Sequence, residues 1–216
     1  MTERHLEEMI RRALRPERWA KIERALHNRL GAVRVVVENL HHAHNLSAVM
    51  RTCEALGVQH VHVVDEAEHC KLSRRITMGA HKWLTVHRHA RFSDCAAALR
   101  ARGFHLYAAM LDPGALSLEE IPVDRPVALV LGNEKEGVCP ETRGLCDGAY
   151  FIPMYGFVQS YNVSVAAAIS LYSLTRRVRQ ERPDRGLLSA EERAEVLRSW
   201  MPKSLRFGRR LLRTSG

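Results

Sequence analysis

The chain has 216 residues, 46% of them hydrophobic, and a formal net charge of +9. This length suits one globular domain with extensions. No apolar run approaches the roughly 20 residues of a membrane span, and the first residues, MTERHLEEMIRRALR, lack the apolar core of a signal peptide. We therefore expect a cytoplasmic protein that does not bind a membrane.

The positive charge lies at the two ends of the chain. Residues 1–31 hold 8 Lys and Arg against 5 Asp and Glu, residues 32–175 hold 13 against 14, and residues 176–216 hold 12 against 5. Basic helices are often only solvated surfaces. Here the last 14 residues carry five cations and no acid, with Trp200 and Phe207 beside them. Cations interleaved with aromatic rings suit phosphate contact and base stacking, so we expect a nucleic-acid partner. The candidate RNA contacts are Arg11, Arg12, Lys203, Arg206, Arg209 and Arg210.

The first half of the chain predicts helices, then a strand and another helix. Apolar residues recur at helical spacing over residues 2–30, with a break near Pro16. The run VRVVVE at 33–38 predicts a buried strand. The next apolar pattern predicts a helix closed by Gly57, with Ser47, Arg51 and Glu54 on its polar face.

Strands and helices continue to alternate along the rest of the chain. We expect strands at 60–64, 84–87, 104–110, 126–131 and 150–153, and helices at 94–102, from near Ser160 onward, and at 187–200. Nearly all-apolar strands imply a parallel sheet between layers of helices, hence an α/β fold. Ligands bind at the carboxyl ends of such strands, where Asn45 and the loops 132–134 and 155–162 fall.

Several familiar chemistries lack their patterns. Neither G-x-x-x-x-G-K-[ST] nor a G-x-G-x-x-G after a strand occurs. The twelve histidines include i, i+2 pairs at 60 and 62 and at 87 and 89, but these fall on predicted strands and no acids are placed to complete a site. We therefore expect no metal. Five cysteines without a C-x-x-C pair predict reduced, structural thiols.

Taken singly, the polar residues of these loops have ordinary explanations. Arg51 could be a surface arginine, Glu134 a turn residue, and Ser160 or Asn162 a helix cap. In combination, three segments carry more information: NLSAVMRTCEALGV (45–58), LVLGNEKEGV (129–138) and IPMYGFVQSYNVSVAAA (152–168). In this order they resemble the three motifs of the SPOUT methyltransferases, in particular the SpoU/TrmH family of RNA ribose 2′-O-methyltransferases. The resemblance covers roughly residues 33–175.

The resemblance implies a fold, a cofactor and an assembly. Residues from about 127 to 173 would form a deep trefoil knot, an exception to unknotted topology, and would bind S-adenosylmethionine within an obligate homodimer. Carried over by motif, the cofactor pocket comprises Ala109, Gly132, Ile152 and Tyr161. The catalytic and substrate-positioning set comprises Asn45, Arg51, Glu134, Ser160 and Asn162. The chain would then divide into a basic helical extension (1–31), a methyltransferase domain (32–175), and a second basic extension with a tail (176–216).

The resemblance also implies a substrate. Members that act on ribosomal RNA often carry a separate amino-terminal recognition domain, whereas the short basic extensions here resemble the members that methylate guanosine 18 in the D-loop of tRNA. We therefore expect tRNA as the substrate. The alternatives are another tRNA or rRNA nucleotide, or a non-catalytic RNA-binding protein on the same fold. The last has little reason to retain Asn45, Arg51, Glu134 and Asn162 together.

Overall fold

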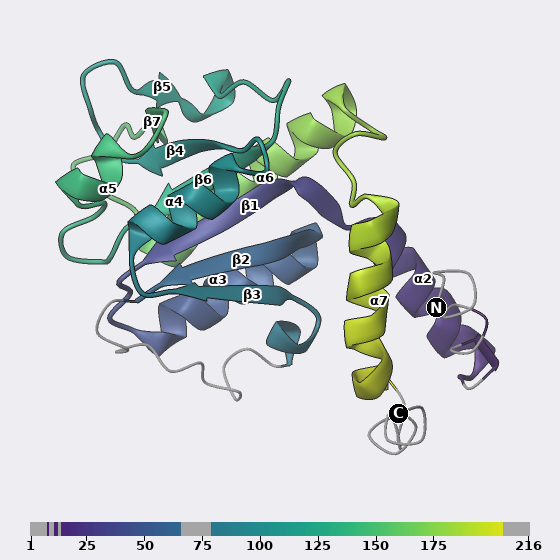
Figure 1. Cartoon of the computed structure of the whole chain (residues 1–216). Helices are drawn as coiled ribbons and strands as arrows, with labels where there is room; N and C mark the ends of the chain where they lie inside the picture. Colours follow the sequence, from purple (N-terminus) through teal and green to yellow (C-terminus); the bar gives the residue numbers. More distant parts are fainter. Residues whose placement is uncertain (1–7, 9–10, 13, 66–78, 205–216) are drawn as a thin grey trace.

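A seven-stranded parallel sheet forms the centre of the molecule, in the strand order β3-β2-β1-β6-β4-β7-β5 (Figure 1). The computed structural model describes residues 8, 11–12, 14–65 and 79–204. Its strands are β1 (Leu30–Glu38), β2 (Val58–Val64), β3 (Thr85–His89), β4 (His105–Ala109), β5 (Leu116–Ser117), β6 (Val127–Leu131) and β7 (Gly148–Phe151). All six strand pairings are parallel, which confirms the predicted α/β class.

Helices cover both faces of this sheet. Helices α3 (Ala43–Leu56) and α6 (Val163–Glu181) pack on one face, and α4 (Phe92–Arg100) and the short α5 (Pro140–Gly144) lie on the other (Figure 1). Side chains alternate along a strand, so β1 sends Val35 and Val37 into the first core and Val36 into the second. Every residue of β1 is buried, as expected for a central parallel strand.

The two chain extensions form a third apolar cluster beside the sheet. Helix α2 (Pro16–His27) and helix α7 (Ala190–Ser204) lie side by side (Figure 1). The Trp200 side chain is only 2% exposed, and its indole N–H donates to the Trp83 carbonyl oxygen at 3.0 Å. The expectation that Trp200 stacks on nucleic-acid bases is therefore wrong, because its ring fills the core between these helices.

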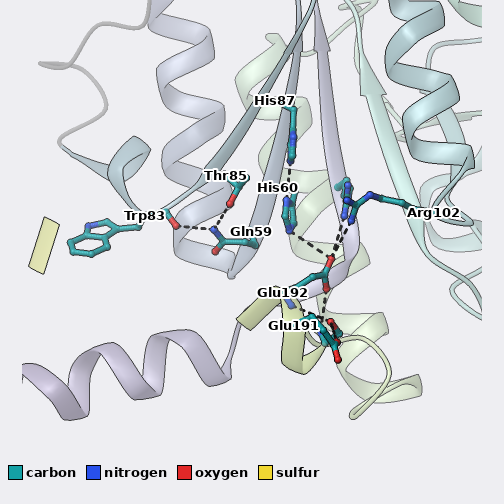
Figure 2. A network of polar contacts seen from close by, with 10 residues as sticks. Gln59, His60, Trp83, Thr85, His87, Arg102, Glu191 and Glu192 are labelled. Carbon is teal, nitrogen blue, oxygen red and sulfur yellow. Dashed lines mark hydrogen bonds and ion pairs between the residues drawn. The ribbon is translucent and has the colours of Figure 1, made fainter. Parts of the chain in front are cut away.

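A polar network connects α7 to the sheet (Figure 2). Ser189 and Glu192 exchange hydrogen bonds at the start of α7, which is a capping box. The Glu192 carboxylate also accepts from Arg34 of β1 at 3.4 Å and lies 3.9 Å from both His60 and Arg102. One carboxylate thus caps the helix and binds it to the sheet.

Other differences from the sequence-based expectations have local causes. Helix α6 begins at Val163 rather than near Ser160, because the Asn162 side chain accepts from the Ser164 amide and caps the helix. It continues to Glu181, past the expected domain boundary at 175. Ser47 is buried rather than on an exposed polar face, since α3 also packs against α6. Elements β5 and α5 were not predicted, being too short to show a periodic pattern. Among the described helices, none combines the length and apolar character that crossing a membrane requires.

Candidate active site

Three predicted cofactor residues meet where adjacent strands end. Ala109 is the last residue of β4, Gly132 follows β6, and Ile152 follows β7. Strand β4 lies between β6 and β7, and Ala109 is in register with Tyr150. Because the strands are parallel, these residues lie at the same edge of the sheet. Ala109 and Ile152 are partly buried against the core, so the edge offers an apolar wall beside main-chain groups.

The loop after β6 is closed by its own hydrogen bonds. Asn133 and Gly137 exchange backbone hydrogen bonds of 3.0 and 3.1 Å, and the Asn133 side chain accepts from the amides of Lys135 and Glu136. A Cβ atom at Gly132 would lie 1.9 Å from the Gly137 carbonyl group, inside van der Waals contact. Only glycine fits there, which explains the G-N-E sequence at this strand end.

Glu134 binds this loop to the segment that follows β1. Its carboxylate accepts from the backbone amides of His41 (3.1 Å) and His42 (3.3 Å) and from the side-chain amide of Asn45 (2.6 Å). Burial acts to raise the pKa of Glu134, but these hydrogen bonds outweigh it and hold the pKa below its usual value. The carboxylate is therefore ionised at neutral pH.

Asn162 extends this set of hydrogen bonds to the third motif. Its side-chain N–H donates to Asn45 Oδ1 at 3.4 Å, while its oxygen accepts from the amide (2.9 Å) and hydroxyl (2.6 Å) of Ser164. Glu134, Asn45 and Asn162 thus form a hydrogen-bonded line, which we call the polar line. It joins all three sequence motifs. Ser160 and Tyr161 lie exposed in the loop before α6. Among the described residues, neither side chain forms a hydrogen bond with the polar line.

Arg51 lies apart from the polar line. It is six residues beyond Asn45 on α3, about 9 Å further along the helix axis. Its exposed side chain lines a cavity of about 790 Å³ together with Arg18 and Lys21 of α2 and with Trp83. Across the described residues, its guanidinium has no hydrogen-bond or ion-pair partner. A cavity with three exposed cations suits a polyanion such as RNA.

The predicted RNA contacts are only partly described. Arg11 and Arg12 are exposed, and Arg12 pairs with Glu8 at 2.6 Å. Lys203 donates to the Lys82 carbonyl oxygen at 2.7 Å. Three further residues lie outside the described part of the chain: Arg206, Arg209 and Arg210.

Sequence reasoning missed several residues that build this site. The amides of His41 and His42 bind Glu134, and Asn133 closes the loop. The sequence signal that could have pointed to these residues was that they follow closely after two predicted strands. Arg18 and Lys21 line the Arg51 cavity. No sequence signal beyond the basic character of their helix points to them.

The structure is that of an α/β protein with a cluster of hydrogen-bonded polar side chains near the carboxyl ends of its parallel strands. Residues 32–172 match the SpoU rRNA Methylase family, and the chain belongs to this family. The chain is 39% identical over 187 residues to the tRNA (guanosine(18)-2'-O)-methyltransferase of Thermus thermophilus. That alignment covers 86% of this chain and 96% of the relative. The family resemblance of the three motifs is thereby confirmed.

Solved structures agree with this assignment. The TrmH/SpoU tRNA modifying enzyme of A. aeolicus superposes with a TM-score of 0.75 at 34% identity, covering 85% of this chain and 96% of that one. The AdoMet-bound rRNA methyltransferase of Sinorhizobium meliloti gives a TM-score of 0.63 at 26% identity, covering 71% of this chain and 60% of that one. The first match spans nearly the full length of the enzyme.

Proposed function

We propose that the protein transfers a methyl group from S-adenosylmethionine to the ribose 2′-hydroxyl of guanosine 18 in the D-loop of tRNA, in the cytoplasm. The observation that carries this proposal is the polar line of Glu134, Asn45 and Asn162, which unites the three motifs beside the strand ends of β4, β6 and β7. The near full-length identity with a tRNA guanosine-18 methyltransferase supports the choice of nucleotide.

The residues at the strand ends fit the cofactor. Ala109 and Ile152 offer partly buried apolar surface for an adenosyl group, and Gly132 lets the chain turn without a side chain in the way. When bound, the cofactor supplies an electrophilic methyl group whose leaving group is a neutral thioether. The main chain at Gly132, Ile152 and Tyr161 would hold it, while Glu134 keeps the loop after β6 in place.

Arg51 would act on the substrate. Methyl transfer to a ribose requires in-line alignment and removal of the hydroxyl proton. A guanidinium has five N–H donors and no acceptor, and it stays protonated at neutral pH. Arg51 would therefore hold a substrate phosphate and polarise the 2′-hydroxyl, and in that bound geometry the guanidinium would release one N–H proton to solvent as it takes up the hydroxyl proton. Asn45, Ser160 and Asn162 would position the ribose.

A defined tRNA tests this proposal. The purified chain is incubated with labelled S-adenosylmethionine and an unmodified tRNA, in the presence of excess chelator, and the methylated nucleotide is mapped by mass spectrometry. We expect one 2′-O-methylguanosine, at position 18. A matched tRNA with 2′-deoxyguanosine at that position should accept no methyl group. Methylation at another nucleotide would contradict the assigned position, and failure with every RNA would favour the non-catalytic alternative.

We also propose that the protein acts as a homodimer. Large apolar side chains are exposed on α6 and on the loop before it: Tyr155, Phe157, Val158, Tyr161, Val165 and Tyr172. Such a patch marks an interaction surface. We propose a second copy of this chain as its partner, because Arg51 forms no hydrogen bond with the polar line of its own chain and a dimer could bring it to the polar line of the partner. Light scattering should give twice the chain mass, and Val165→Arg with Tyr172→Arg should halve it. A monomeric wild type would contradict this.

We propose that the chain is knotted, on the basis of its path through the sheet. After β6 the chain passes α5 on the α4 face and pairs as β7 beyond β4, then returns as α6 on the α3 face. This wrapping around β4 supports a trefoil knot over about 127–173. Stretching the unfolded chain in optical tweezers should give a contour shorter than the roughly 3.6 Å per residue of an open chain. A full-length contour would exclude the knot.

We also propose which segments of the chain bind the cofactor and which bind RNA. We assign catalysis and cofactor binding to residues 32–175, and RNA contact to the basic extensions 1–31 and 176–216. The packing of α2 against α7 brings the two extensions together beside the Arg51 cavity. Both extensions could therefore bind one RNA.

A further inference from the structure

Four histidines occupy one face of the strands at the edge of the sheet. His60 and His62 of β2 alternate with Val61, and His62 is in register with His87 of β3, which places His87 and His89 on the same face. The rings of His62 and His87 stack with centroids 4.4 Å apart. A parallel strand covered by a helix normally carries apolar side chains at such positions. This histidine face therefore needs a separate explanation.

The four rings form two pairs with the same spacing but different surroundings. In each pair an Nδ1 atom of β2 lies 3.0 Å from an Nε2 atom of β3. The His60–His87 pair leads to Glu192 at the start of α7 (Figure 2). The His62–His89 pair instead lies near α4, where Cys95 offers its sulfur: one ligand atom from each of these three residues lies within 4.8 Å of the others.

The second pair is also nearly enclosed. Cys95 is 0% exposed and His62 is 2% exposed, whereas His89 is partly open to solvent. The Nε2 atom of His62 is buried and has no hydrogen-bond partner among the described residues. An unpartnered buried polar atom is unfavourable and rare. A bound ion would supply the partner that the Nε2 atom of His62 lacks.

We propose that His62, His89 and Cys95 form a binding site for a divalent transition-metal ion, zinc in particular. Two imidazoles and one thiolate are a ligand set that zinc accepts, and three protein ligands leave a fourth position for water. In a tetrahedral zinc site the ligand atoms lie about 3.3 to 3.6 Å apart, from Zn–N near 2.0 and Zn–S near 2.3 Å. The present spacing, within 4.8 Å, would have to contract to this value when the ion binds. The proposal differs from the sequence-based expectation of no metal.

The charges of the site can be balanced. Burial raises the pKa of the Cys95 thiol to about 12, so the metal-free thiol carries its proton and releases it to solvent when the ion binds. The nearby Arg34 opposes a cation, but its guanidinium pairs with Glu192 and lies 4.5 Å over the Phe104 ring. The ion would fasten α4 to β2 and β3. It lies on the opposite face of the sheet from Arg51, so it would have no part in methyl transfer.

Cobalt titration of the full chain tests the proposal. Metal-free protein should bind one Co²⁺ with a thiolate-to-cobalt charge-transfer band, and Cys95→Ser should abolish that band. Loss of a residue that only supports a metal ligand typically weakens metal affinity about 10- to 100-fold. His62→Gln and His89→Gln remove ligands themselves, so each should weaken Co²⁺ binding by more than this. His60→Gln and His87→Gln are matched controls, since they disrupt an equally spaced pair without a thiol. Cys53→Ser controls for a buried cysteine on the other face.

A second measurement needs no variant. X-ray absorption of the zinc-loaded wild type should show one sulfur at about 2.3 Å and nitrogen or oxygen ligands at about 2.0 Å. A shell of nitrogen and oxygen alone would overturn the proposal, as would binding that Cys95→Ser leaves unchanged. In either case the ion would be bound by other histidines of the chain, and the His62–His89 pair would be only hydrogen-bonded.

Discussion

The side-chain amide of Asn45 donates a 2.6 Å hydrogen bond to Glu134, a residue 89 positions away in the sequence. This contact binds the start of α3 to the loop after β6, so the first two motifs support one another. Removing either partner should disturb the same structure. Two single variants and the double variant can therefore measure the link.

We predict that Asn45→Ala and Glu134→Gln are coupled by about 1 kcal/mol in unfolding free energy, since the bond reaches a charged acceptor but is only partly buried. Each variant should also lower methyl transfer at least about 10-fold by misplacing the loop. Chemical denaturation of the four proteins measures the coupling. Glu136→Gln, in the same loop, is the matched control and should change neither quantity. Strict additivity would show that the bond is unimportant.

The depressed pKa of Glu134 makes a pH prediction. A carboxylate whose folded pKa lies below its ordinary value of 4.5 contributes stability above that value and loses it as the pH falls through the folded pKa. The stability difference between wild type and Glu134→Gln should therefore be constant near neutral pH and shrink in acid, as the pH falls below 4.5 and through the depressed pKa. Denaturation from pH 7 to pH 3 measures it. A difference that grows in acid would contradict this assignment.

Arg51→Ala should reduce kcat/KM by at least about 100-fold while leaving cofactor affinity nearly normal, because Arg51 lies on α3, away from the strand ends that we propose hold the cofactor. Lysine should not restore activity, since a point charge lacks the planar fork that holds phosphate and hydroxyl together. Calorimetry measures the cofactor affinity. Arg125→Ala, at the opposite end of the sheet, should have no effect. An equal loss of cofactor affinity would contradict the assigned role.

The sequence predicted the class of fold because buried strands and amphipathic helices differ in period, and from Pro16 onward each long element expected in the described residues was found within a few residues. The helix expected before Pro16 lies largely outside the described residues. The candidate cofactor residues came from the family resemblance, and the structure places Ala109, Gly132 and Ile152 at the ends of adjacent strands. The contact of Asn45 with Glu134 and Asn162 could not be derived from periodicity, because it depends on which strands become neighbours. The histidine face was missed for the same reason. Histidines two residues apart are compatible with an ordinary strand. Only the register of β2 with β3, which places His62 beside His87, shows that the histidines form one face.

Trp200 shows where composition misleads, since an aromatic residue near cations can belong to the core. Trp200→Ala should lower the unfolding free energy by about 3 to 5 kcal/mol, because the ring is 2% exposed. Trp200→Phe keeps most of the apolar surface and loses the bond to Trp83, so it should lower the unfolding free energy by only about 1 kcal/mol. Its tRNA affinity should equal that of wild type. Weaker tRNA binding without a loss of stability would restore the stacking hypothesis.

The basic ends of the chain make the last prediction. Residues 205–216 carry four cations, Arg206, Arg209, Arg210 and Arg213, and deletion from residue 205 leaves α7 complete. If two or three of these cations contact phosphates, the slope of log affinity against log salt should flatten by roughly 1.5 to 2.5 units, with cofactor binding unchanged.

Arg11→Ala with Arg12→Ala gives an independent test at the other end. The ion pair of Arg12 with Glu8 is highly exposed and weak, so a phosphate can replace it. This double variant should flatten the slope by roughly 1 to 2 units. Filter binding of tRNA at several salt concentrations measures both slopes, with Arg125→Ala as the control for loss of a cation from the sheet domain. Identical slopes in all four proteins would show that the extensions are only solvated and that RNA binds through the Arg51 cavity alone.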